Sequence, residues 1–138
     1  MNTIETPMYR KNGTRVQLSE LLAGLPENNW NWVIIEFDGV GQMPFHLSLS
    51  EFQKKLRGLP QGLTLTWAEM LKFANSIEYT IDCLIVAVST LDKLNISNFM
   101  EDNFQLSEVA LRAIDSTEWI LSASDSSLLD DLAKTACG

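Results

Sequence analysis

Two segments of the chain are apolar on both of the faces that a β-strand presents, and they constrain the fold more than any other feature. Residues 30–37 read Trp-Asn-Trp-Val-Ile-Ile-Glu-Phe, and residues 79–89 contain the uninterrupted apolar run 83–88. Such a strand must be covered on both faces, whereas a strand with one solvated face alternates apolar and polar residues. We therefore expect both segments to be central strands that lie next to each other in one sheet.

Alternation along residues 30–37 predicts which side chains share a face, because successive strand residues point to opposite sides of a sheet. The pattern places Trp32, Ile34 and Glu36 on one face, and Val33, Ile35 and Phe37 on the other. Asp38 and Gly39 follow directly and predict a turn over 38–41 that ends the strand.

Three helices are predicted by the residues at their N-termini. Ser48 and Glu51 have the spacing of a capping box, as do Thr66 and Glu69, and apolar residues follow each pair at helical intervals. Asp125 offers a cap for a closing helix whose leucines share one side. We expect these helices to pack their apolar faces on the sheet.

The remaining segments carry weaker signals. Asn12-Gly13 predicts a type I′ turn inside a hairpin over 8–16, and Pro44 places a half-buried strand over 43–47 at an edge. Further predictions are a short helix after Ser19, a loop with a short helix over 89–103, either strand or helix over 106–114, and a third strand over 117–123.

These elements predict an α/β (α+β) fold with a single mixed central sheet flanked by helices and an N-terminal β-hairpin. The length of 138 residues corresponds to one domain, 1–138. No apolar run approaches the roughly 20 residues of a membrane-spanning helix, and the N-terminus lacks the pattern of an export signal. We therefore expect a cytoplasmic protein with no membrane partner, in which Cys83 and Cys137 are free thiols.

The net charge of −8 is confined to the C-terminal part of the chain. Residues 1–75 hold seven basic and seven acidic residues, whereas residues 76–138 hold three basic and eleven acidic residues. A negative field repels nucleic acid and anionic lipid and attracts a cationic protein. The charge distribution therefore predicts a cationic protein partner and no nucleic-acid partner.

No motif in the sequence names a reaction. His46 is the only histidine, and one histidine with two distant cysteines does not supply a metal site of the usual kind. Glu36 and Asp38 lie two residues apart at a strand end and could act as a carboxylate pair, but a solvated strand end explains them as well. We expect no enzyme activity, no cofactor and no metal, and we expect the four tryptophans to lie mainly in the core.

In size, acidity and architecture the chain resembles the immunity proteins that bacteria pair with polymorphic or contact-dependent toxins. The acidic segments 115–121 and 125–134 are in the style of that group. The resemblance implies a protein-binding inhibitor, a monomer or weak dimer, that blocks the active site of a cationic toxin domain. A nuclease is the expected toxin, because carboxylates would then stand in for phosphates.

Partner-binding residues are expected where acidic residues fall in loops of the C-terminal part, since loops carry binding residues more often than scaffolds do. These residues are Asp92, Glu101, Asp102, Asp115 and Glu118, with Glu36 and Asp38 as a nearby reserve. Two alternatives remain open: an acidic secretion chaperone for an effector protein, and a small enzyme that uses Glu36, Asp38 and His46.

Overall fold

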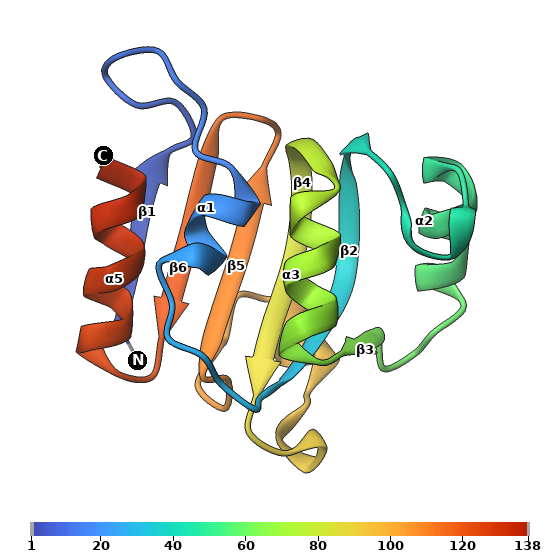
Figure 1. Ribbon diagram of the computed structural model, residues 1–138. Helices are drawn as coiled ribbons and strands as arrows, with labels where there is room; N and C mark the ends of the chain where they lie inside the picture. The colour runs from blue at the N-terminus through green and yellow to red at the C-terminus, as the bar shows by residue number, and fades with distance from the viewer. Residues whose placement is uncertain (1, 138) are drawn as a thin grey trace.

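The computed structural model describes residues 2–137 and contains one six-stranded sheet in the order β1-β6-β5-β4-β2-β3 (Figure 1). Every neighbouring pair of strands is antiparallel, so the predicted fold class is confirmed with an antiparallel sheet in place of the mixed one expected. The strands are β1 (Asn2–Pro7), β2 (Asn31–Gly41), β3 (Leu63–Leu65), β4 (Ile77–Val88), β5 (Val109–Ile114) and β6 (Glu118–Ala123).

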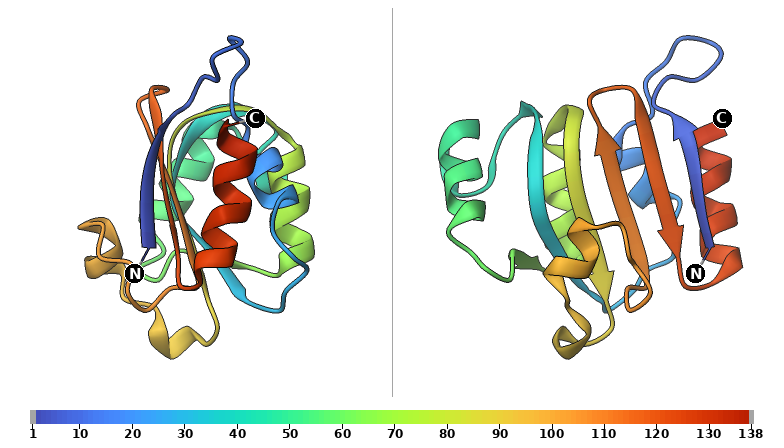
Figure 2. Two further views of the ribbon diagram at one scale, coloured as in Figure 1. Left: turned by 90° about the vertical axis from the view of Figure 1, so that its left-hand side faces the viewer. Right: turned by 180° about the vertical axis from the view of Figure 1, so that it is seen from behind.

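The helices lie unequally on the two faces of this sheet (Figure 2). One face carries α1 (Leu18–Ala23), α3 (Trp67–Asn75) and α5 (Ser126–Cys137). The helix α2 (Leu49–Arg57) lies beside β2, near the edge of the sheet that β3 forms. The short α4 (Ile96–Met100) is the one helix on the opposite face. No helix within residues 2–137 is long and apolar enough to cross a membrane.

Local capping chemistry starts α2 and α3 where the sequence predicts. The Glu51 amide donates to Ser48 Oγ at 3.2 Å, and the Glu69 amide donates to Thr66 Oγ1 at 3.2 Å. The carboxylate of each glutamate accepts a hydrogen bond from the backbone amide of its cap residue, which completes the capping box. Both glutamates are therefore occupied in holding a helix N-terminus.

β2 and β4 are neighbours in the interior of the sheet, as predicted. Their side chains contribute to two apolar clusters, a large one beneath α1, α3 and α5 and a smaller one on the face of α4. Trp32 and Trp119 are fully buried in the large cluster, and Trp30 and Trp67 are half-buried against it. The tryptophans thus belong mainly to the core, as expected.

A β-bulge at Ile35 overturns the predicted faces of β2. Ile34 is the partner of Ile85 and Glu36 is the partner of Leu84, so Ile35 is one extra residue on β2. An extra residue shifts every later side chain to the other face of the sheet. Phe37 therefore packs in the large cluster, and Glu36 is exposed on the face opposite Trp32.

Two further predictions around β2 are wrong. Residues 38–41 continue the strand instead of forming a turn, because the long β4 offers partners as far as Ile77. Residues 43–47 are not an edge strand but contain a 3₁₀ turn over Pro44–His46. Its central residues Phe45 and His46 have φ values of 62° and 57°, which no strand allows.

The N-terminal hairpin is also looser than predicted. Tyr9 and Arg15 form a single bridge, and of the predicted turn pair only Gly13 has a positive φ, at 87°. A type I′ turn needs a positive φ at both central residues, so this loop is not one. The first strand, β1, instead pairs with β6 at the edge of the sheet.

The predictions for the C-terminal part of the chain agree with the structure more closely. The third strand is β6, and the ambiguous segment after 106 is the strand β5. Segment 89–103, predicted as a loop with a short helix, contains a 3₁₀ turn over Leu91–Lys93 and the helix α4.

Candidate functional site: an acidic trough on the open face of the sheet

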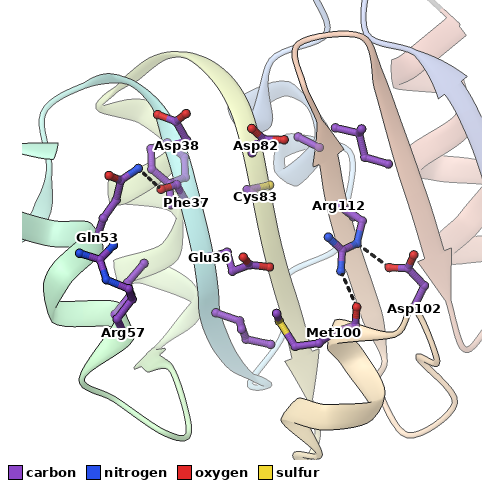
Figure 3. Close-up of a pocket in the computed structure, with 14 residues that line it drawn as sticks. Glu36, Phe37, Asp38, Gln53, Arg57, Asp82, Cys83, Met100, Asp102 and Arg112 are labelled. Carbon is purple, nitrogen blue, oxygen red and sulfur yellow. Dashed lines mark hydrogen bonds and ion pairs between the residues drawn. The ribbon is translucent and has the colours of Figure 1, made fainter. Parts of the chain in front are cut away.

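The face of the sheet opposite α1, α3 and α5 is covered only in part. Val33, Val86 and Val88 at one end lie under Phe99 and Phe104, which belong to residues 96–104, called here the α4 segment. At the other end of the same strands the sheet is open, and a hollow of about 620 Å³ extends over it. We call this hollow the trough; β2, β4 and β5 form its floor, α2 one wall and the α4 segment the other (Figure 3).

Three carboxylates stand on the floor of the trough. Asp38 on β2 and Asp82 on β4 are directly opposite each other in the strand register, and Glu36 lies one row away opposite Leu84. Glu36 and Asp82 are exposed and Asp38 is half-buried. None of the three forms an ion pair among the described residues, whose two ion pairs are Arg10–Glu20 and Arg112–Asp102.

Asp82 is held in place by the turn between β5 and β6. Its Oδ1 accepts a hydrogen bond of 2.8 Å from the Asp115 backbone amide. Asp115 and Ser116 are the central residues of that turn, with φ values of 48° and 58°, and the Ser116 amide donates to Ile81 O at 2.9 Å. The turn thereby orients one carboxylate oxygen of Asp82, and the other oxygen has no hydrogen-bond partner within residues 2–137.

The single basic residue on the floor is already neutralised. Arg112 on β5 donates from Nε to Asp102 Oδ1 at 2.5 Å and from a terminal nitrogen to Met100 O at 3.1 Å. These contacts fasten the end of α4 to the sheet and form one wall of the trough (Figure 3). On the other wall, Gln53 of α2 donates to Phe37 O at 3.0 Å, and Arg57 stands at the rim.

Two more acidic side chains share the open face beyond the trough. Trp119 and Ile4 pack in the large cluster, so alternation directs Glu118 on β6 and Glu5 on β1 to the opposite face. The strands therefore direct five acidic side chains and the paired Arg112 to this face, with Arg57 of α2 at the rim, so negative charge predominates where α4 leaves the sheet uncovered.

The five predicted partner-binding residues do not form one cluster. Asp102 lines the trough, Glu101 precedes it at the end of α4, and Asp115 contacts Asp82 through its backbone. Asp92 is different, because it lies in the 3₁₀ turn that follows the far end of β4. The reserve residues Glu36 and Asp38 turn out to be central to the site.

Asp82 is a site residue that the sequence by itself does not single out. Its signal was a carboxylate interrupting an otherwise apolar strand, a pattern that also fits a strand end exposed to solvent. Its role depends on the bulge in β2, which turns Asp38 toward the same face. No sequence pattern of β4 alone could have identified that pairing.

The carboxylates of the trough do not lie together with His46 or with a reactive cysteine. His46 lines a separate groove beside α3, so Glu36, Asp38 and His46 do not form one site. Cys83 lies beneath the floor, where burial raises the pKa of its thiol to about 12, so it is not a nucleophile near neutral pH. Within residues 2–137, no three side chains of His, Cys, Asp or Glu gather closely enough to hold a metal ion.

What the trough can do is bind positive charge. Its carboxylates stand on rigid strands, its walls are helices, and its apolar contacts include Ile35, Met100 and Ile114. This combination suits basic side chains, whose aliphatic stems pack on apolar surface while their heads meet carboxylates. Comparison with models of protein families, with curated proteins and with solved structures found no match to this chain.

Proposed function

We propose that the protein is a protein-binding inhibitor whose trough docks on a cationic domain, in the manner of a toxin-immunity protein. The observation that supports this proposal most directly is the pairing of Asp38 with Asp82 on an uncovered sheet face. Like charges directly opposite each other across two strands are destabilising, and neither aspartate forms an ion pair with a basic side chain among the described residues. A basic side chain from a partner would supply the missing counter-charge.

The rigidity of the surface favours inhibition by occlusion. The carboxylates project from strands in the middle of the sheet, so little conformational entropy is lost when a partner binds them. A row of fixed carboxylates resembles the phosphates of a nucleic acid in charge, and a nuclease holds phosphates with lysine and arginine. We therefore expect the partner to be a toxin domain with a basic groove, and a nuclease in particular.

The first candidate partner is the protein encoded by the gene immediately upstream, because we expect the genes of a toxin and its inhibitor to be adjacent. The test co-expresses the C-terminal domain of that protein with the full 138-residue chain and measures cell growth. The wild-type chain should restore growth that the toxin domain alone arrests. The variant Asp38→Lys/Asp82→Lys should fail to restore it, because both carboxylates become repulsive to a cationic surface.

A matched control separates the site from the overall charge. Asp130→Lys/Asp131→Lys makes the same change in net charge on α5, which lies on the other face of the sheet, and leaves the Asp125 cap of that helix intact. This control should rescue growth as the wild type does, and titration calorimetry with an inactivated toxin domain should show binding that weakens with salt. Rescue by the trough variant, or absence of binding to that domain, would contradict the proposal.

A further inference from the structure

A second surface of the molecule differs from the trough, because it carries lysines and exposed aromatic surface where the trough carries carboxylates. It surrounds Phe45, in the turn between β2 and α2, where a groove of about 370 Å³ runs toward α3. Buried or nearly buried apolar side chains form the bottom of this groove, namely Met43, Leu65 and Phe73. We propose that this groove is a docking site for an acidic segment of a partner protein that inserts one large apolar side chain beside Phe45.

The conformation of Phe45 is the first observation behind this proposal. Phe45 and His46 are consecutive non-glycine residues with positive φ, a region that is unfavourable for a bulky side chain. Burial of the ring does not offset this backbone strain, because 61% of Phe45 is exposed to solvent. The fold therefore holds an aromatic ring at the surface in a conformation that is unfavourable in free energy. An exposed, fixed aromatic side chain is typical of a residue that anchors a binding partner.

A neighbouring lysine orients the ring. Lys55 of α2 lies over Phe45, with Nζ 5.0 Å from the ring centroid. A cation above an aromatic face is attracted to it, so the ring is preorganised rather than free to sweep through solvent. Preorganisation lowers the entropic cost of binding a partner at this position.

The charge around the groove determines the kind of partner. Lys72 lines the groove and Lys55 lies over Phe45 beside it, and neither lysine forms an ion pair among the described residues. Glu69 also lines the groove, but its carboxylate accepts a hydrogen bond of 2.9 Å from the Thr66 amide and is committed to capping α3. Glu69 keeps its negative charge, but Lys55 and Lys72 outnumber it, so the net charge around the groove is positive although the chain as a whole carries −8.

An acidic partner segment with one apolar side chain complements this surface. Its carboxylates would meet Lys55 and Lys72, and its apolar side chain would cover Phe45 and Phe73. The trough attracts the opposite charge, so the two surfaces would bind different partners. This site does not depend on the function proposed for the trough.

The experiment titrates the isotope-labelled full chain with the acetylated, amidated pentapeptide Glu-Glu-Leu-Glu-Glu and follows chemical shifts. Saturable shifts are expected at residues of the groove, Met43, Phe45, Leu65 and Phe73. Two control peptides replace the central leucine by serine or the four glutamates by lysine, and each should bind at least about tenfold more weakly, the loss expected for removing an anchor.

Two variants separate binding from structure. Phe45→Gly removes the ring and suits the positive φ, so its melting temperature should equal or exceed that of the wild type while peptide affinity falls at least about tenfold. Leu91→Gly, at another half-exposed apolar residue, should leave peptide affinity unchanged. The trough variant Asp38→Lys/Asp82→Lys should also bind the peptide as before, so failure of one proposal is distinguishable from failure of the other.

Three results would overturn the docking site. The first is a fall in the melting temperature of Phe45→Gly, which would make the ring a structural element. The second is equal binding of the serine peptide, which would reduce the effect to unspecific charge attraction. The third is a set of peptide-induced shifts located outside the groove.

Discussion

Asp38 and Asp82 are direct partners across β2 and β4, so two carboxylates share one cross-strand position on the open face of the sheet. The bulge at Ile35 creates this relationship, because it turns Asp38 toward the side on which Asp82 already stands. A like-charged pair in this position costs roughly 0.2–1 kcal/mol of stability. The pair therefore lowers the stability of the free protein while it provides the negative charge that the proposed partner would bind.

The first prediction is that Asp38→Asn stabilises the free protein. Removing one of two opposed charges should raise the free energy of unfolding by roughly 0.2–1 kcal/mol at low ionic strength. The gain should vanish in 1 M salt, where the Debye length is only about 3 Å. Urea unfolding at both salt concentrations measures this, with Asp130→Asn on α5 as a control that should have no comparable effect. A loss of stability in Asp38→Asn would show that the pair is not repulsive.

The second prediction concerns the wall of the trough that Arg112 fastens. Arg112→Gln removes the contacts to Asp102 and Met100, so amide hydrogen exchange at the end of α4 should accelerate. The loss of global stability should stay below about 1 kcal/mol, because Asp102 is half exposed. Arg10→Gln breaks the other ion pair, to Glu20, and should leave exchange near α4 unchanged. Uniform exchange changes in both variants would argue against a local fastening.

The third prediction is a pH dependence carried by Cys83. Burial raises the pKa of this thiol to about 12, whereas a thiol in an unfolded chain titrates near about 8.5. Between these values the unfolded chain has lost a proton that the folded protein keeps, so stability falls as pH rises, by up to about 1.4 kcal/mol per pH unit. Below about pH 8 the thiol is neutral in both states and contributes no slope.

Urea unfolding at pH 8, 9 and 10 tests this sign. Cys83→Ala lacks the thiol, so the gap in stability between the wild type and this variant should shrink as pH rises. Lysine and tyrosine residues titrate in both proteins and cancel in the comparison. A constant gap would mean that the thiol ionises equally in the folded and unfolded states.

The fourth prediction tests the core of the sheet. Ile85 is fully buried on β4 opposite Ile34 and Leu111, so Ile85→Asp should abolish folding by placing an unpaired charge in the interior. Ile85→Val should fold and lose only about 0.5–1.5 kcal/mol. Circular dichroism and thermal melts distinguish the two. A folded aspartate variant would show that this part of the sheet is not a packed core.

The features that the sequence determined are those that depend on neighbouring residues. The capping pairs Ser48–Glu51 and Thr66–Glu69 lie within one helical turn, so they start α2 and α3 whatever surrounds them. The β-branched apolar run 83–88 indicates β4 in the same way, because a strand with such a run must be covered on both faces. Fold class and the central position of β2 and β4 followed from these local signals.

Tertiary structure alone decided which carboxylates form the site. Alternation assigned Glu36 to the face of Trp32, and the bulge at Ile35 reversed this, since a bulge depends on the register with β4 and not on the residues of β2. Alternation likewise predicted a strand through Phe45, where the chain instead makes a strained turn. Both outcomes depend on how distant strands and helices meet, and that information is not contained in any single segment.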